Sequence, residues 1–432
     1  MATAKGGHDA KMLLNCSIEF PIINVSVERL RNRIAPWKGI DMVQTTEGRT
    51  YIWELKDWPR FTWDAGRLSE ALASARRSQG ELLGMVKAID QVASNEAAVA
   101  AMVQEVVSNS AIEGVALNME SVRASMLLRL GVVTGLTQVA GVQHVDPIVG
   151  VLTEATQGYR DPLTTERIFG WHRALFPKGI QEGIRVFPAG ILRGEGPMVV
   201  ASPGRHIGLP PTIHFEAPGR EVLEGEVEAF LAWFNAPPAG LDGLFRTALA
   251  HLWFITVHPL ADGNGRIART ITDLALSQDE QLPLRYYSLS VQIMRNKQNY
   301  YDALENAQRG GMDITDWLAW FLSQVLQATR HGVREVAMVM ARSRFWAMAR
   351  KFSLNPRQEM VLKAILSPMS REDAVSNAYY CKLADTNRTT ASRDLAELVG
   401  MDLLRPYGAG RSASYRVDLD RFTPDWAQLS TS

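Results

Sequence analysis

Residues 258–269, which read HPLADGNGRIAR, bring together residue types that bind phosphate. Two glycines in this segment allow a tight turn and let a ligand approach the backbone closely. The amides after them would lie at the amino end of a helix, where unpaired N–H groups and the helix dipole attract anions. Two arginines three positions apart share one helix face and can contact successive phosphates. We therefore predict a polyphosphate cradle formed by Gly263, Asn264, Gly265, Arg266 and Arg269.

Two more side chains of the segment add reactive chemistry to this cradle. Asp262 is a hard carboxylate at its edge, and Mg²⁺ shared with phosphates rarely takes more than one or two protein ligands. His258 has an ordinary pKa of about 6.5, which suits removal of a hydroxyl proton at neutral pH. These residues predict a metal ligand and a general base for direct attack of a hydroxyl on the phosphorus of a bound nucleotide.

Two other interpretations of the segment compete with this one. Gly263, Gly265 and Ala268 also fit G-x-G-x-x-A, the dinucleotide-binding pattern, with Asp279 or Glu280 as the ribose ligand. The residues before the pattern have helical rather than strand spacing, however, and the pattern does not explain the histidine, the aspartate and the arginines. Alternatively, the histidine is a core residue and the glycines form a structural turn between two helices, although such a turn seldom gathers so many polar types.

The segments on both sides of the motif have the periodicity of buried helices. Apolar residues recur at three- and four-residue spacing before and after it, and Asp242 is a candidate amino-terminal cap. The motif is therefore predicted to be a loop between two interior helices. The apolar residues in question are Leu244, Ala248, Leu252, Ile255, Ile267, Ile271, Leu274 and Leu276.

Helical periodicity dominates the rest of the chain as well, so the predicted fold class is mostly α. Helical spacing is lost between residues 184 and 215, where short apolar runs flank a Gly/Pro-rich middle and predict a β-hairpin. Earlier in the chain, Trp53, Trp58, Phe61 and Trp63 are expected to close a small core rather than to stack on a ligand. The predicted helices are residues 68–86, 95–112, 121–130, 147–159, 165–175, 224–234, 242–257, 266–277, 288–308 and 314–338.

Length, charge and cysteine content limit the classes of function. The 432 residues predict two or three domains, and 46 basic against 46 acidic residues argue against a general affinity for nucleic acid or anionic membranes. Cys16 and Cys381 form neither a disulfide framework nor a CxxC metal site, which fits a reducing compartment. Because no secretory or membrane-spanning segment is found in the sequence, we expect a cytoplasmic protein without a membrane partner.

Residues 258–269 resemble the Fic motif, HPFx[D/E]GNGRxxR, of enzymes that transfer AMP from ATP to a hydroxyl side chain of a target protein. The resemblance covers about residues 93–327, and the stretch from Tyr51 resembles the small amino-terminal domain of one bacterial branch of that family. It implies a Fic helical-bundle core with an inserted hairpin flap. Leu260 stands where the family usually has Phe; because Leu is also apolar, we expect altered loop packing rather than lost chemistry.

The resemblance implies a role for each motif residue. His258 would be the general base, Asp262 the Mg²⁺ ligand, and the two arginines the phosphate clamps. Tyr300 and Tyr301 lie where family members line the adenine pocket, although aromatic residues on a helix are more often core residues. The residues implied for the anion hole are Gly263, Asn264 and Gly265.

The hairpin at residues 196–215 matches the flap of the family, a sheet edge that would pair with an extended segment of the target. Such main-chain pairing would position a target hydroxyl without reading much sequence. The alternative is an ordinary solvent-exposed hairpin. The implied docking residues are Met198, Val199, Val200 and Ile213.

Residues 108–114, which read SNSAIEG, resemble the inhibitory pattern [S/T]xxxE[G/N] found upstream of the Fic motif. The resemblance implies that Glu113 pairs with Arg269, removes the positive charge meant for the nucleotide and repels its phosphates. Asn109 stands where the family has Ser or Thr, and its amide can make similar hydrogen bonds. The alternative is a surface glutamate followed by a glycine that ends a helix.

The carboxy-terminal part of the chain predicts a separate winged helix-turn-helix. Lys382, Arg388 and Arg393 are candidates for contacts with DNA, but basic and acidic residues balance at ten each from residue 353 to the end. We therefore keep DNA binding and protein docking as two alternative functions of this part of the chain. The predicted elements are helices at residues 356–366, 378–384 and 389–399 and strands at residues 403–407 and 413–417.

Five parts are expected along the chain. They are a poorly ordered extension at residues 1–48, where Met42 is a candidate natural start, an amino-terminal helical domain with the inhibitory helix at 49–150, a Fic core at 151–335, a linker helix at 336–352, and the winged helix-turn-helix at 353–432.

We expect a protein adenylyltransferase that moves AMP from Mg·ATP to a Ser, Thr or Tyr hydroxyl of a target protein and is inhibited by Glu113. The expected partners are that target, the chain itself through self-modification, and DNA through the winged helix; a homodimer is left open. One alternative is a transcriptional regulator whose nucleotide-occupied core controls the winged helix. Another is a Fic-fold enzyme that transfers UMP, phosphocholine or a phosphoryl group, or that removes AMP.

Overall fold

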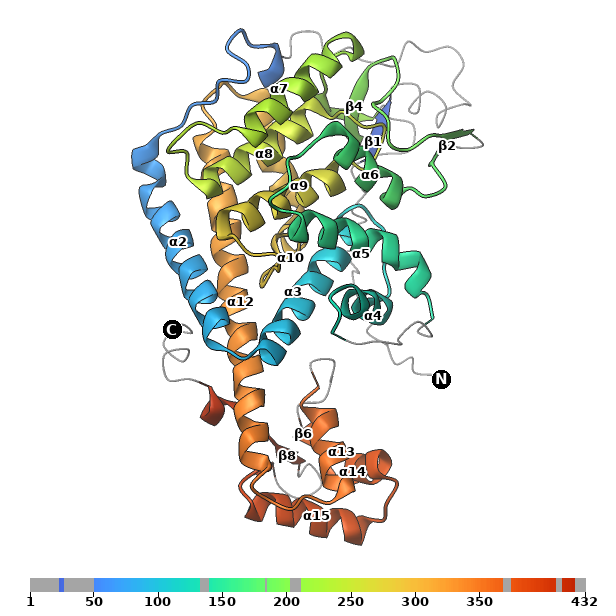
Figure 1. The fold of residues 1–432 in the computed structure, drawn as a ribbon, viewed down its shortest axis with the longest axis vertical. Helices are drawn as coiled ribbons and strands as arrows, with labels where there is room; N and C mark the ends of the chain where they lie inside the picture. The colour runs from blue at the N-terminus through green and yellow to red at the C-terminus, as the bar shows by residue number, and fades with distance from the viewer. Residues whose placement is uncertain are drawn as a thin grey trace, which may run out of the picture.

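The chain forms a large helical body and a smaller one, joined by one long helix (Figure 1). A computed structural model describes residues 23–26, 50–132, 140–182, 185–202, 211–367, 374–408 and 414–423. Most of these residues are helical, which confirms the mostly α fold class. None of the helices in these ranges is both long and apolar enough to cross a membrane.

Several helices of the larger body begin at polar caps. Asp64, Asp90 and Thr164 each accept a backbone N–H from the first turn of the helix that follows. The helices are α2 (Ala65–Ala88), α3 (Gln91–Ile112), α4 (Met119–Arg129), α5 (Val142–Gln157), α6 (Thr165–Leu175), α7 (Leu223–Asn235), α8 (Gly243–Val257), α9 (Asn264–Glu280), α10 (Leu289–Arg295), α11 (Lys297–Arg309) and most of α12 (Thr315–Ala349).

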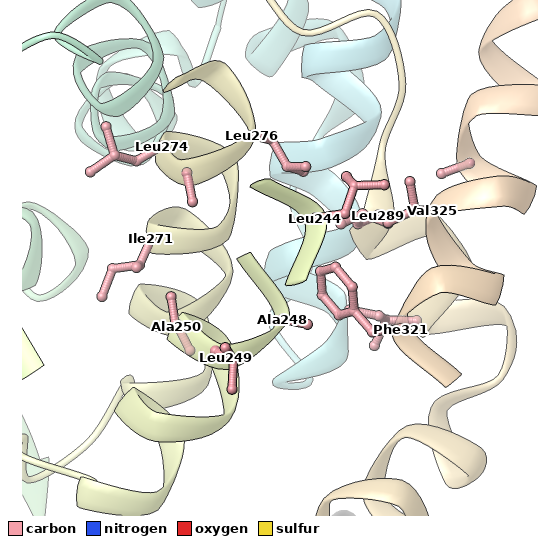
Figure 2. Packing of buried hydrophobic residues seen from close by; sticks show 14 of the residues in the cluster. Leu244, Ala248, Leu249, Ala250, Ile271, Leu274, Leu276, Leu289, Phe321 and Val325 are labelled. Carbon is pink, nitrogen blue, oxygen red and sulfur yellow. The ribbon is translucent and has the colours of Figure 1, made fainter. Parts of the chain in front are cut away.

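The two helices that flank the motif, α8 and α9, form the centre of this body. Residues 264–277 of α9 are all buried, as are residues 244–257 of α8 apart from Arg246. Asp242 caps α8 as predicted, because its carboxylate accepts the N–H of Leu244 at 2.8 Å. The predicted loop between two interior helices is therefore confirmed. Figure 2 shows part of this packing, with Leu244, Ala248, Leu249 and Ala250 of α8, Ile271, Leu274 and Leu276 of α9, Leu289 of α10, and Phe321 and Val325 of α12.

Three aromatic residues ahead of α2, Trp58, Phe61 and Trp63, join this core instead of closing a small one. The rings of Trp58 and Phe61 lie 6.0 and 6.1 Å from that of Trp253 in α8, centroid to centroid. The ring of Trp63 lies 5.6 Å from that of Phe245 in the same helix. The prediction of a small core was wrong for these three rings, because their partners come from a helix almost 200 residues further along the chain. Trp53 does pack against a small cluster, which contains Tyr51, Met198, Phe215 and Ala217.

The β structure is richer than the single predicted hairpin. β2 (Ile180–Glu182) and β3 (Arg185–Phe187) form one antiparallel pair, and β4 (Met198–Ser202) and β5 (Thr212–Glu216) form the second. On its other edge β4 pairs with β1 (Ile23–Ser26), so the sheet order is β1-β4-β5. β1 falls within the predicted poorly ordered extension, whose other residues lie outside the described part of the chain.

The structure divides one predicted helix and joins two others. The helix predicted over residues 288–308 is divided into α10 and α11 at Asn296, whose φ of −127° and ψ of 45° are not helical. The helix predicted over residues 314–338 and the basic helical stretch after it are instead one continuous helix, α12.

The smaller body is assembled on the carboxy-terminal end of α12, where Phe345 and Ala349 are buried in its core. The predicted helices and strands occur in the predicted order, and a short strand that was not predicted, Ala374–Val375, lies between the first two helices. The connection predicted at Ala409 and Gly410 lies outside the described residues. The elements are α13 (Pro356–Ile365), α14 (Asn377–Ala384), α15 (Arg388–Gly400) and a sheet of order β6 (Ala374–Val375), β8 (Ser414–Arg416), β7 (Arg405–Tyr407).

Candidate functional site

His258 ends α8 in a left-handed conformation, with φ of 51° and ψ of 55°. This conformation costs a non-glycine residue about 1–2 kcal/mol. The ring is 1% exposed, and its Nδ1 lies 3.0 Å from the carbonyl oxygen of Ile255. Because a carbonyl only accepts hydrogen bonds, Nδ1 must carry the proton of the neutral ring, and Nε2 keeps its lone pair. Within the described residues Nε2 has no hydrogen-bond partner.

The surroundings of His258 keep its ring neutral. Burial lowers its pKa to about 4, and the cation of Arg193 acts in the same direction. The carbonyl of Ile255 and the carboxylate of Glu113 oppose this shift without cancelling it. At pH 7 the ring is therefore in the form that can accept a proton, as a general base requires.

A hydrogen-bonded loop connects His258 to α9. The buried side chain of Asn264 donates to the carbonyl oxygen of Leu260 at 2.7 Å and accepts the N–H of the same residue at 2.9 Å. Leu260 is fully buried, so the position that usually holds Phe still packs into the core. Gly263 has a φ of 77°, and a Cβ there would lie 2.7 Å from the ring of Phe176. Sequence reasoning assigned only the amide of Asn264 to the site; its side chain also closes the loop.

The amino end of α9 has no side-chain cap and lies beside a buried cation. Arg266 is buried, and its guanidinium carbon lies 4.6 Å from the centroid of the Phe176 ring. Its Nε has no hydrogen-bond partner among the residues that the structure describes. Burial lowers the pKa of Arg266, because a charge without water around it is costly. A cation with a free donor beside helix amides is a place where an anion gains several hydrogen bonds.

The carboxylate of Glu113 lies against this end of α9. Nη2 of Arg269 donates to Oε1 of Glu113 at 2.7 Å, and Nε of Arg269 donates to Oδ1 of Asn109 at 2.7 Å. A Cβ placed on Gly265 would collide with the same carboxylate oxygen. Burial raises the pKa of Glu113, but the charge and hydrogen bond of Arg269 outweigh burial and leave the pKa below its ordinary value. The structure thus brings together Glu113, Asn109 and Arg269, which the sequence pattern associated.

A cavity with an empty volume of about 730 Å³, including open space at its mouth, adjoins these groups. Tyr300 is both a core residue and a wall of the cavity, since it is buried and its hydroxyl lies 2.9 Å from Nε2 of His251. Tyr301 is only partly buried. The lining includes His258, Gly265, Arg269, Glu113, Tyr300 and Tyr301.

The hairpin β4–β5 forms another wall of the cavity through Val200. Of the other predicted docking residues, Met198 and Val199 are buried, and the carbonyl of Ile213 accepts a hydrogen bond from Arg309 of α11 at 3.0 Å. Both edges of β4 are paired, one with β5 and one with β1. Docking of a target on these residues stays a prediction.

Asp262 is the carboxylate expected to hold Mg²⁺. Its Oδ1 accepts the N–H of Gly263 at 2.6 Å, which holds the carboxylate at the amino end of α9. The described residues contain no group of three or more His, Cys, Asp or Glu side chains that could hold a metal. A single carboxylate still fits Mg²⁺, because this ion takes most of its ligands from phosphates and water.

Sequence reasoning missed two residues that support the site. Arg193 donates to the carbonyl oxygen of His258, and the ring of Phe176 supports Arg266. Both lie more than 60 residues before the motif and act through a backbone carbonyl or a ring face. No spacing rule in the sequence signals such contacts.

Parts of this chain match two family models and a curated relative. Residues 51–132 match DUF4172, a domain of unknown function, and residues 162–276 match the Fic/DOC family. A protein of Aquifex aeolicus named a probable protein adenylyltransferase is 24% identical over 105 residues. That match covers 24% of this chain and 30% of the relative, so the chain spans less than a third of the relative's length.

Solved structures with similar folds include a Fic family protein from Desulfovibrio desulfuricans and a Fic domain containing signaling protein from Bacteroides thetaiotaomicron. The first is 18% identical with a TM-score of 0.48, covering 83% of this chain and 98% of that one. The second is 14% identical with a TM-score of 0.44, covering 61% and 97%. The family matches thus relate residues 162–276 to the Fic/DOC family and residues 51–132, ahead of them, to the DUF4172 domain.

Proposed function

We propose that this chain is a Fic-type transferase that moves AMP from Mg·ATP to a Ser, Thr or Tyr hydroxyl of a protein. The observation that carries the proposal is the state of His258, which is buried and neutral, with Nδ1 bonded to the backbone and the ring in the wall of a cavity. The Fic/DOC family match and the distant relative named as an adenylyltransferase support the same class of reaction.

In the proposed reaction the hydroxyl oxygen attacks the α-phosphorus of ATP. The new O–P bond forms while the bond from this phosphorus to the oxygen that bridges to the β-phosphate breaks, and pyrophosphate leaves. Nε2 of His258 accepts the hydroxyl proton. The amides at the start of α9 and the guanidinium of Arg266 stabilise the charge on the transferring group.

Asp262 would hold Mg²⁺ beside the phosphates. When bound, the ion neutralises phosphate charge and orients the triphosphate. The base of the nucleotide would lie toward α11. Tyr301 suits stacking on it better than Tyr300, whose hydroxyl is engaged by His251.

We further infer that α3 inhibits the transfer through Glu113. The carboxylate occupies Nη2 of Arg269 and the space beside Gly265, where outer phosphates of a nucleotide would bind. A phosphate and a carboxylate cannot share these donors, because like charges repel strongly where water is excluded. Asn109 holds Arg269 in the paired position through a second hydrogen bond.

Label from ATP tests both the reaction and the inhibition. The Glu113→Gly variant is incubated with ATP labelled at either the α- or the γ-phosphate, and covalent label on the protein is measured. We expect stable incorporation of the α-label alone, more of it than in the parent, and none after the further change His258→Ala. Glu120→Gly, which removes an exposed acid of α4, is the matched control and should behave like the parent. Incorporation of the γ-label, or α-labelling that persists without His258, would contradict the proposed function.

We also infer that the smaller body is a winged helix-turn-helix that binds duplex DNA. α14 and α15 are joined by a short turn at Asp385, which has a φ of 43°, and β7 and β8 follow as a wing. Arg388 and Arg393 are exposed on α15. On the wing, the guanidinium carbon of Arg416 lies 4.0 Å from the centroid of the Tyr407 ring.

Fluorescence anisotropy of labelled duplexes with the full chain tests this assignment. We expect affinity to fall steeply with salt and to be reduced by Arg393→Ala, because phosphate contacts release counterions. Lys363→Ala removes an exposed cation from α13 and should leave binding unchanged. Equal effects of the two substitutions on DNA affinity, or no binding of DNA at low salt, would favour protein docking instead.

A further inference from the structure

Arg193, which the mechanism above does not use, lies against the backbone of the loop that carries His258. Its Nε donates to the carbonyl oxygen of His258 at 3.0 Å, and its own backbone N–H donates to the carbonyl oxygen of Pro259 at 2.9 Å. Its Nη2 donates to the carbonyl oxygen of Pro218, which precedes α7. One residue thus bridges two successive carbonyls of the loop to a neighbouring segment.

The burial and charge of Arg193 set it apart from an ordinary packing residue. It is 2% exposed, and in the described part of the chain the hydrogen bonds of its guanidinium go to backbone carbonyls rather than to a carboxylate. Burial lowers its pKa to about 10, the charge of Arg220 adds to this shift and that of Glu221 opposes it, so Arg193 is still a cation at neutral pH. A buried cation whose partners are carbonyls alone is costly to keep, and an apolar side chain of similar length would avoid that cost.

The turn at His258 explains what the cation achieves. The left-handed conformation takes the carbonyl of His258 out of the hydrogen-bonding pattern of α8 and leaves it buried. Without a donor this carbonyl would be unsatisfied, and the residue could relax toward a right-handed conformation. Such a change would swing the ring and break the bond between Nδ1 and the carbonyl of Ile255, which decides the tautomer.

We propose that Arg193 is a positioning residue that holds His258 in its left-handed turn and thereby presents the unprotonated Nε2 to the cavity. The effect on rate rests on the proposed function, whereas the effect on the ring does not. Arg193 acts only through the loop backbone and touches no reacting atom.

The ring nitrogens of His258 give a readout that is independent of activity. Full-length chain with ¹⁵N-labelled histidine is compared by long-range ¹H–¹⁵N spectra, and the His258 signals are those lost in His258→Ala. We expect a single Nδ1–H tautomer in the parent and a mixture in Arg193→Met. The matched control is Arg246→Met, because Arg246 is a largely buried arginine of α8 that donates to a carbonyl, that of Phe234, away from the loop.

The transfer reaction gives the second readout, measured in the Glu113→Gly background. Arg193→Met should lower kcat about 100-fold, the loss typical of a misplaced catalytic group, with the KM for ATP changed less than about threefold. Arg246→Met should lower thermal stability and leave kcat unchanged. If Arg193→Met does not fold, Arg193→Gln is measured in its place, since it keeps a polar head but is too short to bridge the carbonyls.

Either Arg193 variant overturns the proposal if its His258 tautomer and its kcat match those of Arg246→Met. If the Glu113→Gly protein with Arg193 intact transfers no AMP while Arg193→Met still scrambles the tautomer, the proposed function is refuted and the positioning role stays intact. A parental tautomer in an Arg193 variant with low kcat would also refute positioning, because the loss would then have another cause.

Discussion

Replacing Glu113 by glutamine tests most directly whether α3 competes with a nucleotide. The change keeps the volume of the side chain and removes one charge. Oε1 of Glu113 lies 2.7 Å from Nη2 of Arg269, and the two side chains are 21% and 3% exposed, so the pair is largely shielded from water. At an effective dielectric constant of about 20, two unit charges about 4 Å apart interact by about 4 kcal/mol.

Only part of this energy becomes coupling between Glu113 and a bound phosphate, because desolvation offsets some of it. A net coupling of about 2–3 kcal/mol corresponds to about 30–150-fold in affinity. Titration calorimetry of the full chain with Mg·ATP should therefore give a Kd about 30–150-fold lower for Glu113→Gln than for the parent. Adenosine, which has no phosphate, should bind both forms equally, and Glu120→Gln should behave like the parent with either ligand.

The same substitution should weaken the ligand-free fold. Arg269 loses its charged partner and keeps only neutral ones, among them Asn109, so the free energy of unfolding in urea should fall by about 1–3 kcal/mol. Tighter ATP binding together with lower stability is the signature of a removed competitor. An unchanged Kd for ATP, or an equal gain for adenosine and ATP, would refute the reasoning.

Two further predictions concern stability. Lowering the pH from about 6.5 to about 4 should destabilise the fold, because burial lowers the pKa of His258 and His172 to about 4 and that of His251 to about 3. In this window the unfolded histidines bind protons and the folded ones do not, so stability rises with pH; a urea midpoint equal at pH 5 and pH 7 would contradict this. Phe345→Ala removes a fully buried ring of the smaller body and should lower its free energy of unfolding by about 3–5 kcal/mol. The smaller body should then unfold in a separate thermal transition at lower temperature, and the affinity for ATP should not change. One shared transition would contradict this, because it would show that the two bodies unfold together.

The motif loop could be predicted because its determinants are local. Glycines, a helix cap at Asp242 and apolar residues at helical spacing act within a few turns of chain, and the structure places a loop between buried helices where they indicate it. The contact between Glu113 and Arg269 was different. It joins residues 156 positions apart, and only the resemblance to a known pattern suggested it.

The features that were missed depend on contacts between distant segments. Trp58 finds its partner Trp253 in α8, and β1 finds the edge of β4, although nothing near either segment indicates the partner. Asn296 interrupts a helical pattern that periodicity alone would continue. Arg193 bonds to carbonyls, which every residue carries, so no residue type marks its target.

The continuity of α12 limits how the two bodies can move. Val339 still belongs to the core of the larger body, and Phe345 already belongs to that of the smaller one. These two residues are six positions apart, which is less than two helical turns. Each residue of the helix between them rotates the smaller body by about 100° about the helix axis relative to the larger one. A single inserted residue would turn the smaller body by that angle, whereas seven would nearly restore its facing. Any signal between the two bodies that requires reorientation must therefore bend or unwind this short stretch of helix.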